Sequence, residues 1–218
     1  MANTVIRILL ADDHTILREG LRAMLEQEPD MVVVAEVSNG RDAVRKAMKL
    51  SPDVVVMDIA MPELNGIDAT RQLVSSPCKT KVLCLSMHEK SAMIDAMLKA
   101  GASGYLLKTS AQKELAKAVR AVSSGETYVS TRIASVLVED HVRGGGVSRD
   151  EVYSRLTMRE REVLQLIAEG YHTKDIGDRL HISPKTVLVH RDNLMKKLDI
   201  DSIASLTRYA LRHGIVDL

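Results

Sequence analysis

Hydrophobic and polar residues follow one pattern in the first half of the chain, and it predicts alternating strands and helices. Short apolar runs, typical of strands buried on both faces, alternate with stretches in which apolar residues recur every three or four positions. The expected strands are 5–11, 31–37, 54–58, 82–86 and 104–107, and the expected helices are 17–25, 39–48, 67–74, 92–100 and 111–122. This order predicts an α/β fold with a doubly wound, five-stranded parallel sheet.

The end of the chain follows a helical pattern throughout. Three N-terminal caps are expected, in chain order, at Thr157 (in a capping box with Glu160), Thr173 and Ser183 (followed by Pro184). The third helix runs to about residue 198, and a fourth covers 204–213. Two short helices joined by the tight turn at 181–183 predict a small all-α domain with a helix-turn-helix.

Residues 127–153 follow neither pattern. The stretch 133–142 fits one short helix, and three consecutive glycines at 144–146 disfavour regular structure because glycine loses the most backbone entropy on folding. The sequence therefore predicts a first domain at 1–126, a linker at 127–153 and a second domain at 154–218.

Composition narrows the class of protein. A length of 218 residues fits two ordinary domains, and a hydrophobic content of 45% provides a core without metals or disulfides. Because the net charge is only +1, a nucleic-acid surface must be a local patch. An aromatic content of 2% disfavours a surface that stacks single-stranded bases. The two cysteines lack metal-ligand spacing and indicate a reducing compartment.

The chain shows no feature of a membrane or secreted protein. Its N-terminus enters a strand pattern directly, without the basic and apolar regions of a signal peptide. No apolar run approaches the roughly 20 residues that span a bilayer. We therefore expect a soluble cytoplasmic protein that does not bind membranes.

Polar residues gather where the expected strands end. Ligands of open parallel sheets bind outside the carboxyl ends of the strands. Four of the five expected strands end at or beside such residues, namely Asp12 and Asp13, Asp58, Ser86 and Lys108. A single aspartate at the end of a strand is more often a turn cap. Polar and charged residues at the ends of four strands, all on one edge of the sheet, instead indicate a functional site.

The residue types of this site suit phosphoryl transfer. Clustered carboxylates repel one another and need a cation, and Mg²⁺ with oxygen ligands suits them. Lys108 would stabilise an incoming phosphoryl group, Ser86 would donate a hydrogen bond to it, and Asp58 could attack phosphorus. A dinucleotide site is disfavoured, because the turn after the first strand is acidic where that site requires glycines.

With Met61-Pro62 and Gly66, these residues resemble the receiver domain of two-component response regulators over about residues 5–125. The resemblance implies a flavodoxin-like sheet with Asp58 as phosphoacceptor. It implies Mg²⁺ held mainly by Asp13, with Asp12, Asp58 and the carbonyl of Ala60. It also implies that Ser86 and Tyr105 form a switch pair and that Lys108 clamps the phosphate. The family often has proline after that lysine, where this chain has Thr109.

The second domain is similar to the LuxR-type DNA-binding domain in the NarL subfamily of response regulators. The resemblance covers about residues 154–216 and is carried by 156–164, Gly170, 174–176, 182–183, Thr186-Val187, His190, Asn193 and Lys197-Leu198. It implies that the helix from Pro184 enters a major groove. The expected DNA contacts are Lys174, Lys185, Thr186, Leu188, Val189, His190, Arg191 and Lys196, and Lys197 is a further base on this helix.

Two positions depart from the family pattern. Leu188 stands where the family usually has lysine, and Asp192 adds an acid where phosphate contacts prefer a base. Both changes put base preference in question. Leu188 would then contact either a thymine methyl group or another protein.

The resemblance as a whole implies a phosphorylation-activated transcription regulator and not an enzyme. Its partners would be a histidine kinase, double-stranded promoter DNA and, once phosphorylated, a second copy of the chain. The unphosphorylated first domain would mask the recognition helix. Two other interpretations stay open: a phosphatase or phosphotransferase acting on a small substrate, and a phospho-regulated protein-interaction module that does not bind DNA.

Overall fold

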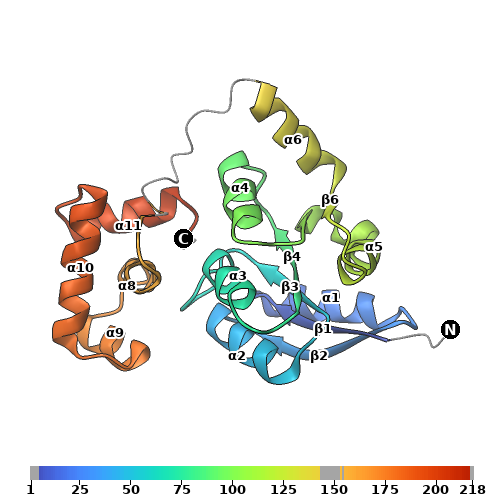
Figure 1. The fold of residues 1–218 in the computed structure, drawn as a ribbon, viewed down its shortest axis with the longest axis horizontal. Coiled ribbons are helices and arrows are strands. Elements are labelled where there is room, and N and C mark those ends of the chain that lie inside the picture. Colours follow the sequence, from blue (N-terminus) through green and yellow to red (C-terminus); the bar gives the residue numbers. More distant parts are fainter. Residues whose placement is uncertain (1–4, 143–152, 154, 217–218) are drawn as a thin grey trace. The chain divides into compact units, whose positions relative to one another are not determined.

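The computed structural model describes residues 5–142, 153 and 155–216, and they fall into two compact units (Figure 1). The units divide between Gly145 and Gly146. The three consecutive glycines expected to break the linker lie outside the described residues.

The first unit is built on a parallel sheet in the order β2-β1-β3-β4-β5-β6. Its strands are β1 (Ile6–Ala11), β2 (Met31–Val37), β3 (Val54–Asp58), β4 (Lys81–Ser86), β5 (Gly104–Leu107) and β6 (Tyr128–Val129). The helices are α1 (Thr15–Glu26), α2 (Gly40–Leu50), α3 (Gly66–Val74), α4 (Ser91–Lys99), α5 (Ala111–Ser123) and α6 (Thr131–Val142). This is the doubly wound α/β fold that the sequence predicts.

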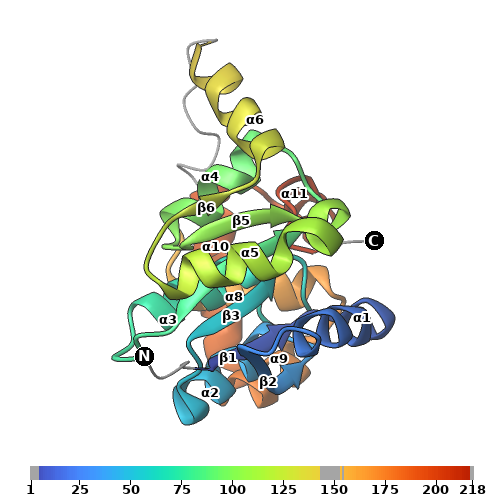
Figure 2. The same cartoon turned by 90° about the vertical axis from the view of Figure 1, so that its right-hand side faces the viewer.

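Helices cover both faces of the sheet (Figures 1 and 2). α1 and α5 pack on one face, where Leu21 and Leu115 are buried. α2, α3, α4 and α6 pack on the other, with Leu73 and Met97 in its core. Because both faces are covered, the middle strands read as continuous apolar runs, and every residue of β3 is buried.

The sheet has six strands where the sequence analysis expects five. β6 adds to the edge of the sheet, where Gly104 pairs with Tyr128 and Tyr105 with Val129. α6 then returns over the sheet and buries Ile133. The start of the segment expected to be a linker therefore belongs to the first unit up to Val142, and the expected short helix there is present.

The second unit consists of α8 (Met158–Ala168), α9 (Thr173–Leu180), α10 (Pro184–Leu198) and α11 (Ile203–Arg212) around one apolar core. The capping box at the start of α8 is present, and the Ser183 side chain caps α10. The cap predicted at Thr173 is wrong by one residue. His172 is the N-cap, without a side-chain hydrogen bond, and Thr173 is the first helical residue.

Among the described residues, no helix is long and apolar enough to cross a membrane. Both cysteines are free thiols, with Cys84 buried in β4 and Cys78 partly buried before it.

Candidate functional site

One ammonium group joins two strand ends at the carboxyl edge of the sheet. Lys108 Nζ lies 2.7 Å from Asp58 Oδ2 and 2.8 Å from Asp12 Oδ2. All three side chains are almost fully buried. Asp58 ends β3, Asp12 follows β1 and Lys108 follows β5, so the parallel register of the sheet brings the three together.

Burial sets the ionisation of this cluster. It raises the pKa of Asp58 to about 6, against the opposing effects of the Lys108 cation and the backbone N–H of Ile59, which donates to Asp58 Oδ1. Burial also opposes the charge on Lys108, but the two carboxylates outweigh it and the pKa of Lys108 is raised. Asp58 is therefore a carboxylate at neutral pH that is costly to keep ionised.

Four residues bring candidate metal-ligand atoms within 4.8 Å of one another: Asp12, Asp13, His14 and Asp58. The loop after β1 holds them in place. The backbone N–H of His14 donates to Asp12 Oδ1, and Arg18 donates to the Asp12 carbonyl. Asp13 keeps a third of its side chain exposed and lies 2.8 Å from the His14 imidazole. This cluster has the oxygen-rich chemistry that suits a hard divalent ion.

Ser86 and Tyr105 lie on adjacent strands near the same edge. Ser86 directly follows Leu85, the register partner of Asp58, and its hydroxyl accepts from the His88 backbone N–H. The Tyr105 hydroxyl donates to the His88 carbonyl over 3.0 Å, and burial raises the pKa of this phenol. Both side chains therefore hold the loop between β4 and α4 at His88.

The loop that carries Ala60 is held by close backbone contacts. The Gly66 N–H donates to the Ile59 carbonyl over 2.7 Å. A Cβ at Gly66 would lie 1.9 Å from the Asp58 carbonyl oxygen, so this position requires glycine. Ala60 lies two residues after Asp58 within this loop. The chain thus fixes the backbone that leaves the strand-end carboxylate.

In the second unit, α10 presents one continuous outer stripe. At roughly 100° per residue, Lys185, Leu188, Val189, Asp192 and Lys196 fall within roughly 100° of one another. All five are exposed. The opposite side of α10 buries Val187 and Leu194. The stripe has a base at each end and apolar and acidic groups between them.

The other expected DNA contacts lie beside the stripe. Thr186 and His190 are partly buried, and the Thr186 hydroxyl lies 2.8 Å from that of Ser183. Arg191, also partly buried, is paired with Asp192 Oδ1 at 3.2 Å. Lys174 is exposed on α9. Of the predicted set, the structure gathers Lys185, Leu188, Val189 and Lys196 onto one face.

Lys197 serves the fold of this unit. Its Nζ lies 2.7 Å from Glu160 Oε2, the carboxylate that completes the capping box of α8. Burial opposes the charge on Glu160, but hydrogen bonds from Lys197 and Thr157 lower its pKa. The sequence analysis counts Lys197 among the bases of this helix, and in the structure its ammonium group is paired with α8.

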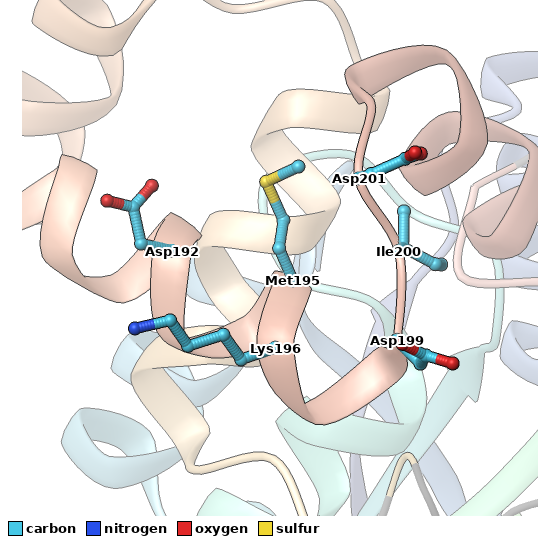
Figure 3. Close-up of a pocket in the computed structure, with 6 residues that line it drawn as sticks. All are labelled: Asp192, Met195, Lys196, Asp199, Ile200 and Asp201. Carbon is cyan, nitrogen blue, oxygen red and sulfur yellow. The ribbon is translucent and has the colours of Figure 1, made fainter.

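An acidic hollow adjoins the C-terminal end of α10 (Figure 3). It is lined by Asp192, Met195, Lys196, Asp199, Ile200 and Asp201. Asp192 and Lys196 project from α10, whereas Asp201 lies on the chain that follows it (Figure 3). Carboxylates therefore gather at this end of the helix, and its N-terminal end carries none in its first turn.

Two family models match the chain. The model described as response regulator receiver domain matches residues 8–120, and the one described as bacterial regulatory proteins, luxR family, matches residues 154–210. Among curated relatives, the oxygen regulatory protein NreC of Staphylococcus haemolyticus is 39% identical over 97% of this chain and 100% of its own length. The transcriptional regulatory protein LiaR of Bacillus subtilis is 40% identical over 98% of this chain and 100% of its own.

Solved structures agree with these matches. A LuxR-family response regulator from Aurantimonas is 39% identical, with a TM-score of 0.61, over 63% of this chain and 99% of that one. A structure of two RcsB dimers bound to two parallel DNAs is 27% identical, with a TM-score of 0.59, over 94% of this chain and 97% of that one. An RcsB response regulator from Salmonella typhimurium is 27% identical, with a TM-score of 0.59, over 94% of this chain and 98% of that one.

Proposed function

Because this chain belongs to the two-component response regulators that join a receiver domain to a LuxR-type DNA-binding domain, we propose that phosphorylation of Asp58 controls its binding to promoter DNA. The phosphoryl donor is a histidine kinase. The observation that carries the proposal is the pairing of Lys108 with both Asp12 and Asp58 at one buried edge of the sheet.

The proposed transfer uses groups already in contact. An Asp58 carboxylate oxygen forms a bond to phosphorus as the bond from phosphorus to the donor imidazole nitrogen breaks, and that nitrogen keeps the electron pair. Lys108 Nζ, now 2.7 Å from Asp58 Oδ2, then pairs with a phosphoryl oxygen. The Ser86 hydroxyl donates to another. As Ser86 and Tyr105 both hold the loop at His88, a change at Ser86 passes to α4.

Mg²⁺ fits the donor set of this site. Asp12, Asp13 and Asp58 would hold it together with the carbonyl of Ala60, since their carboxylate oxygens converge within the reach of one ion. When bound, it neutralises charge on the transferring phosphoryl group. Asp12 also contacts Lys108, so it couples the metal side of the site to the phosphate side.

The output of the proposed switch is a dimer on double-stranded DNA. α10 is the recognition helix, and Lys185 and Lys196 at the two ends of its stripe contact phosphates. Promoter binding places the protein in the cytoplasm. The RcsB dimers on DNA support a two-fold arrangement for a relative of the same domain order.

The test is duplex binding with and without phosphorylation. Fluorescence anisotropy on a labelled promoter library, with a small phosphodonor and Mg²⁺, should show tighter binding of the wild type and no response from Asp58→Asn. Affinity should fall steeply with salt, because bound lysines release counterions from DNA. Binding that ignores both salt and phosphorylation would favour a protein-interaction module, and sustained turnover of a small phosphoester would favour an enzyme.

A further inference from the structure

The outer stripe of α10 has an order that suggests what it recognises. Lys185 and Lys196 stand eleven positions apart, or about 16 Å along the helix at 1.5 Å per residue. A major groove is about 12 Å wide, so the two cations can reach phosphates on either side of it. Leu188, Val189 and Asp192 occupy the stretch between them, where a recognition helix meets base edges.

Phosphate contacts cannot explain the middle of the stripe. Leu188 exposes 38% of its surface to solvent and Val189 exposes 51%, although both lie opposite the apolar core of the unit. Asp192 is also exposed, and a carboxylate facing a phosphate backbone would be repelled. An apolar group and an acceptor-only group instead match two features of base edges. These are the thymine methyl group and the cytosine N4 amino group.

The Asp192 carboxylate is held for such a contact. Arg191 Nη2 lies 3.2 Å from Asp192 Oδ1, which restrains the side chain without a partner from outside the helix. Within the described part of the chain, no hydrogen bond is made to Asp192 Oδ2. The second oxygen is thus available to accept from an amino group.

The acids beyond the stripe limit where phosphate contacts can lie. Asp199 and Asp201 line the hollow beyond Lys196, so Lys196 is the last residue of the stripe that can contact the DNA backbone (Figure 3). Base edges are then contacted between Lys185 and Lys196. Leu188 precedes Asp192 by four residues, or about 6 Å, which spans about two base-pair steps of 3.4 Å.

We propose that Leu188 and Asp192 are the specificity-determining pair of α10. Leu188 contacts a thymine methyl group, and Asp192 accepts a hydrogen bond from the N4 amino group of a cytosine within about two base-pair steps. Lys185 and Lys196 supply affinity without sequence preference. This inference rests on the proposed function, since it names the duplex sequence that the same helix selects.

The experiment begins with selection from a random duplex pool. Wild type, Leu188→Ala and Asp192→Ala are each used as phosphorylated full-length chains. Wild-type ligands should contain one thymine and one cytosine at fixed spacing in each half-site. The Leu188→Ala pool should lose only the thymine, and the Asp192→Ala pool, which lacks the acceptor oxygens, should lose only the cytosine. Lys196→Ala should select the same sequence as wild type with lower affinity.

Binding to one selected duplex then tests each contact. Deoxyuridine in place of the thymine removes only the methyl group, and it should weaken wild type about fivefold but leave Leu188→Ala within about twofold. A thymine–adenine pair in place of the cytosine–guanine pair should weaken wild-type binding about tenfold or more, and it should change binding of Asp192→Ala by no more than about twofold. Asp201→Asn removes a nearby acid outside the stripe and should keep both preferences.

The outcomes distinguish a failure of the Leu188 and Asp192 assignment from a failure of the proposed DNA-binding function. Salt-dependent duplex binding with unchanged preferences in Leu188→Ala and Asp192→Ala overturns this inference alone. A phosphorylated wild type that does not bind duplex DNA contradicts the proposed function together with it. Loss of one preference in each variant, with binding retained, establishes the pair.

Discussion

The Nζ atom of Lys108 and the Oδ2 atom of Asp58 lie 2.7 Å apart, although the two residues are separated by fifty positions in the chain. The contact holds the carboxylate proposed as phosphoacceptor against the cation proposed to bind its product. Lys108 also contacts Asp12, so one ammonium group is paired with two carboxylates of the acidic cluster. We expect these pairs to affect both the stability of the first unit and its response to phosphorylation.

Replacing Lys108 with alanine should separate phosphorylation from its response. The cation that would hold a phosphoryl oxygen is lost, so Asp58 is still labelled while dimerisation fails. Intact-protein mass spectrometry measures the label, and analytical ultracentrifugation measures the dimer. Lys79→Ala removes an exposed lysine from the segment that precedes β4, at the opposite edge of the sheet, and should dimerise normally. Normal dimerisation of phosphorylated Lys108→Ala would count against the clamp.

Asp58 should lower the stability of the first unit at neutral pH. Burial raises its pKa from 3.8 to about 6, so between these values the folded state binds a proton that the unfolded state does not. Stability therefore falls as pH rises from about 4 to about 6, by up to roughly 3 kcal/mol. Asp58→Asn should raise the free energy of unfolding at pH 7 by about 1–3 kcal/mol and flatten this pH dependence.

Urea denaturation with a chelator present measures this effect without bound metal. The surface change Asp95→Asn is a matched control, because Asp95 makes an exposed ion pair with Lys99 and should alter stability by less than about 0.5 kcal/mol. A less stable Asp58→Asn at pH 7 would mean that the Lys108 pair outweighs the cost of burial.

Two glycines should respond to alanine in opposite directions. A Cβ at Gly66 would collide with the Asp58 carbonyl, so Gly66→Ala should cost about 1–3 kcal/mol and slow labelling of Asp58. Gly20 lies exposed within α1 with nothing within 4 Å of its added Cβ. Gly20→Ala should stabilise by about 0.4–1 kcal/mol. Thermal unfolding measures whether each variant is more or less stable than wild type. A change in stability of the same sign and size in both variants would contradict the proposed clash at Gly66.

Neighbouring lysines on α10 should have different roles. Lys196→Ala should weaken duplex binding on all sequences and reduce the salt slope by about one, with unchanged stability. Lys197→Ala should keep the salt slope but speed hydrogen exchange in the first turn of α8, because Glu160 keeps its bond from Thr157 but loses the one from Lys197. The half-exposed Lys197 pair is worth about 0.5–1 kcal/mol. A reduced salt slope in Lys197→Ala would instead show that Lys197 contacts a DNA phosphate.

Much of the fold follows from local pattern. The bounds of β2, β3 and β5 are those expected, because apolar runs that end at polar or glycine residues mark buried parallel strands. The sequence does not predict β6, because a strand of two residues is too short to show an alternating pattern of polar and apolar residues. It forms because Gly104 and Tyr105 lie on a strand whose other side is free to pair. Pairing at an edge is a tertiary effect that no short window contains.

The candidate site divides in the same way. Strand ends placed Asp12, Asp58, Ser86 and Lys108 on one edge of the sheet, because a parallel topology fixes which ends meet. The direction of Lys197 toward Glu160 depends on the packing of α10 against α8, which helical spacing alone does not define. Capping boxes and helix faces depend on residues close in sequence and can be predicted from it. The partner of a long side chain such as that of Lys197 depends on how helices pack and cannot.

The central claim is that Asp58 is the stable phosphoacceptor of this chain. The most direct measurement is mass spectrometry of the full-length protein after incubation with a small phosphodonor and Mg²⁺, followed by reductive mapping of the acyl phosphate. We predict one phosphoryl group, located on Asp58, absent from Asp58→Asn and formed more slowly by Asp13→Ala. Labelling of Asp58→Asn at undiminished yield, or a phosphoryl group mapped to another residue of the wild type, would contradict the account.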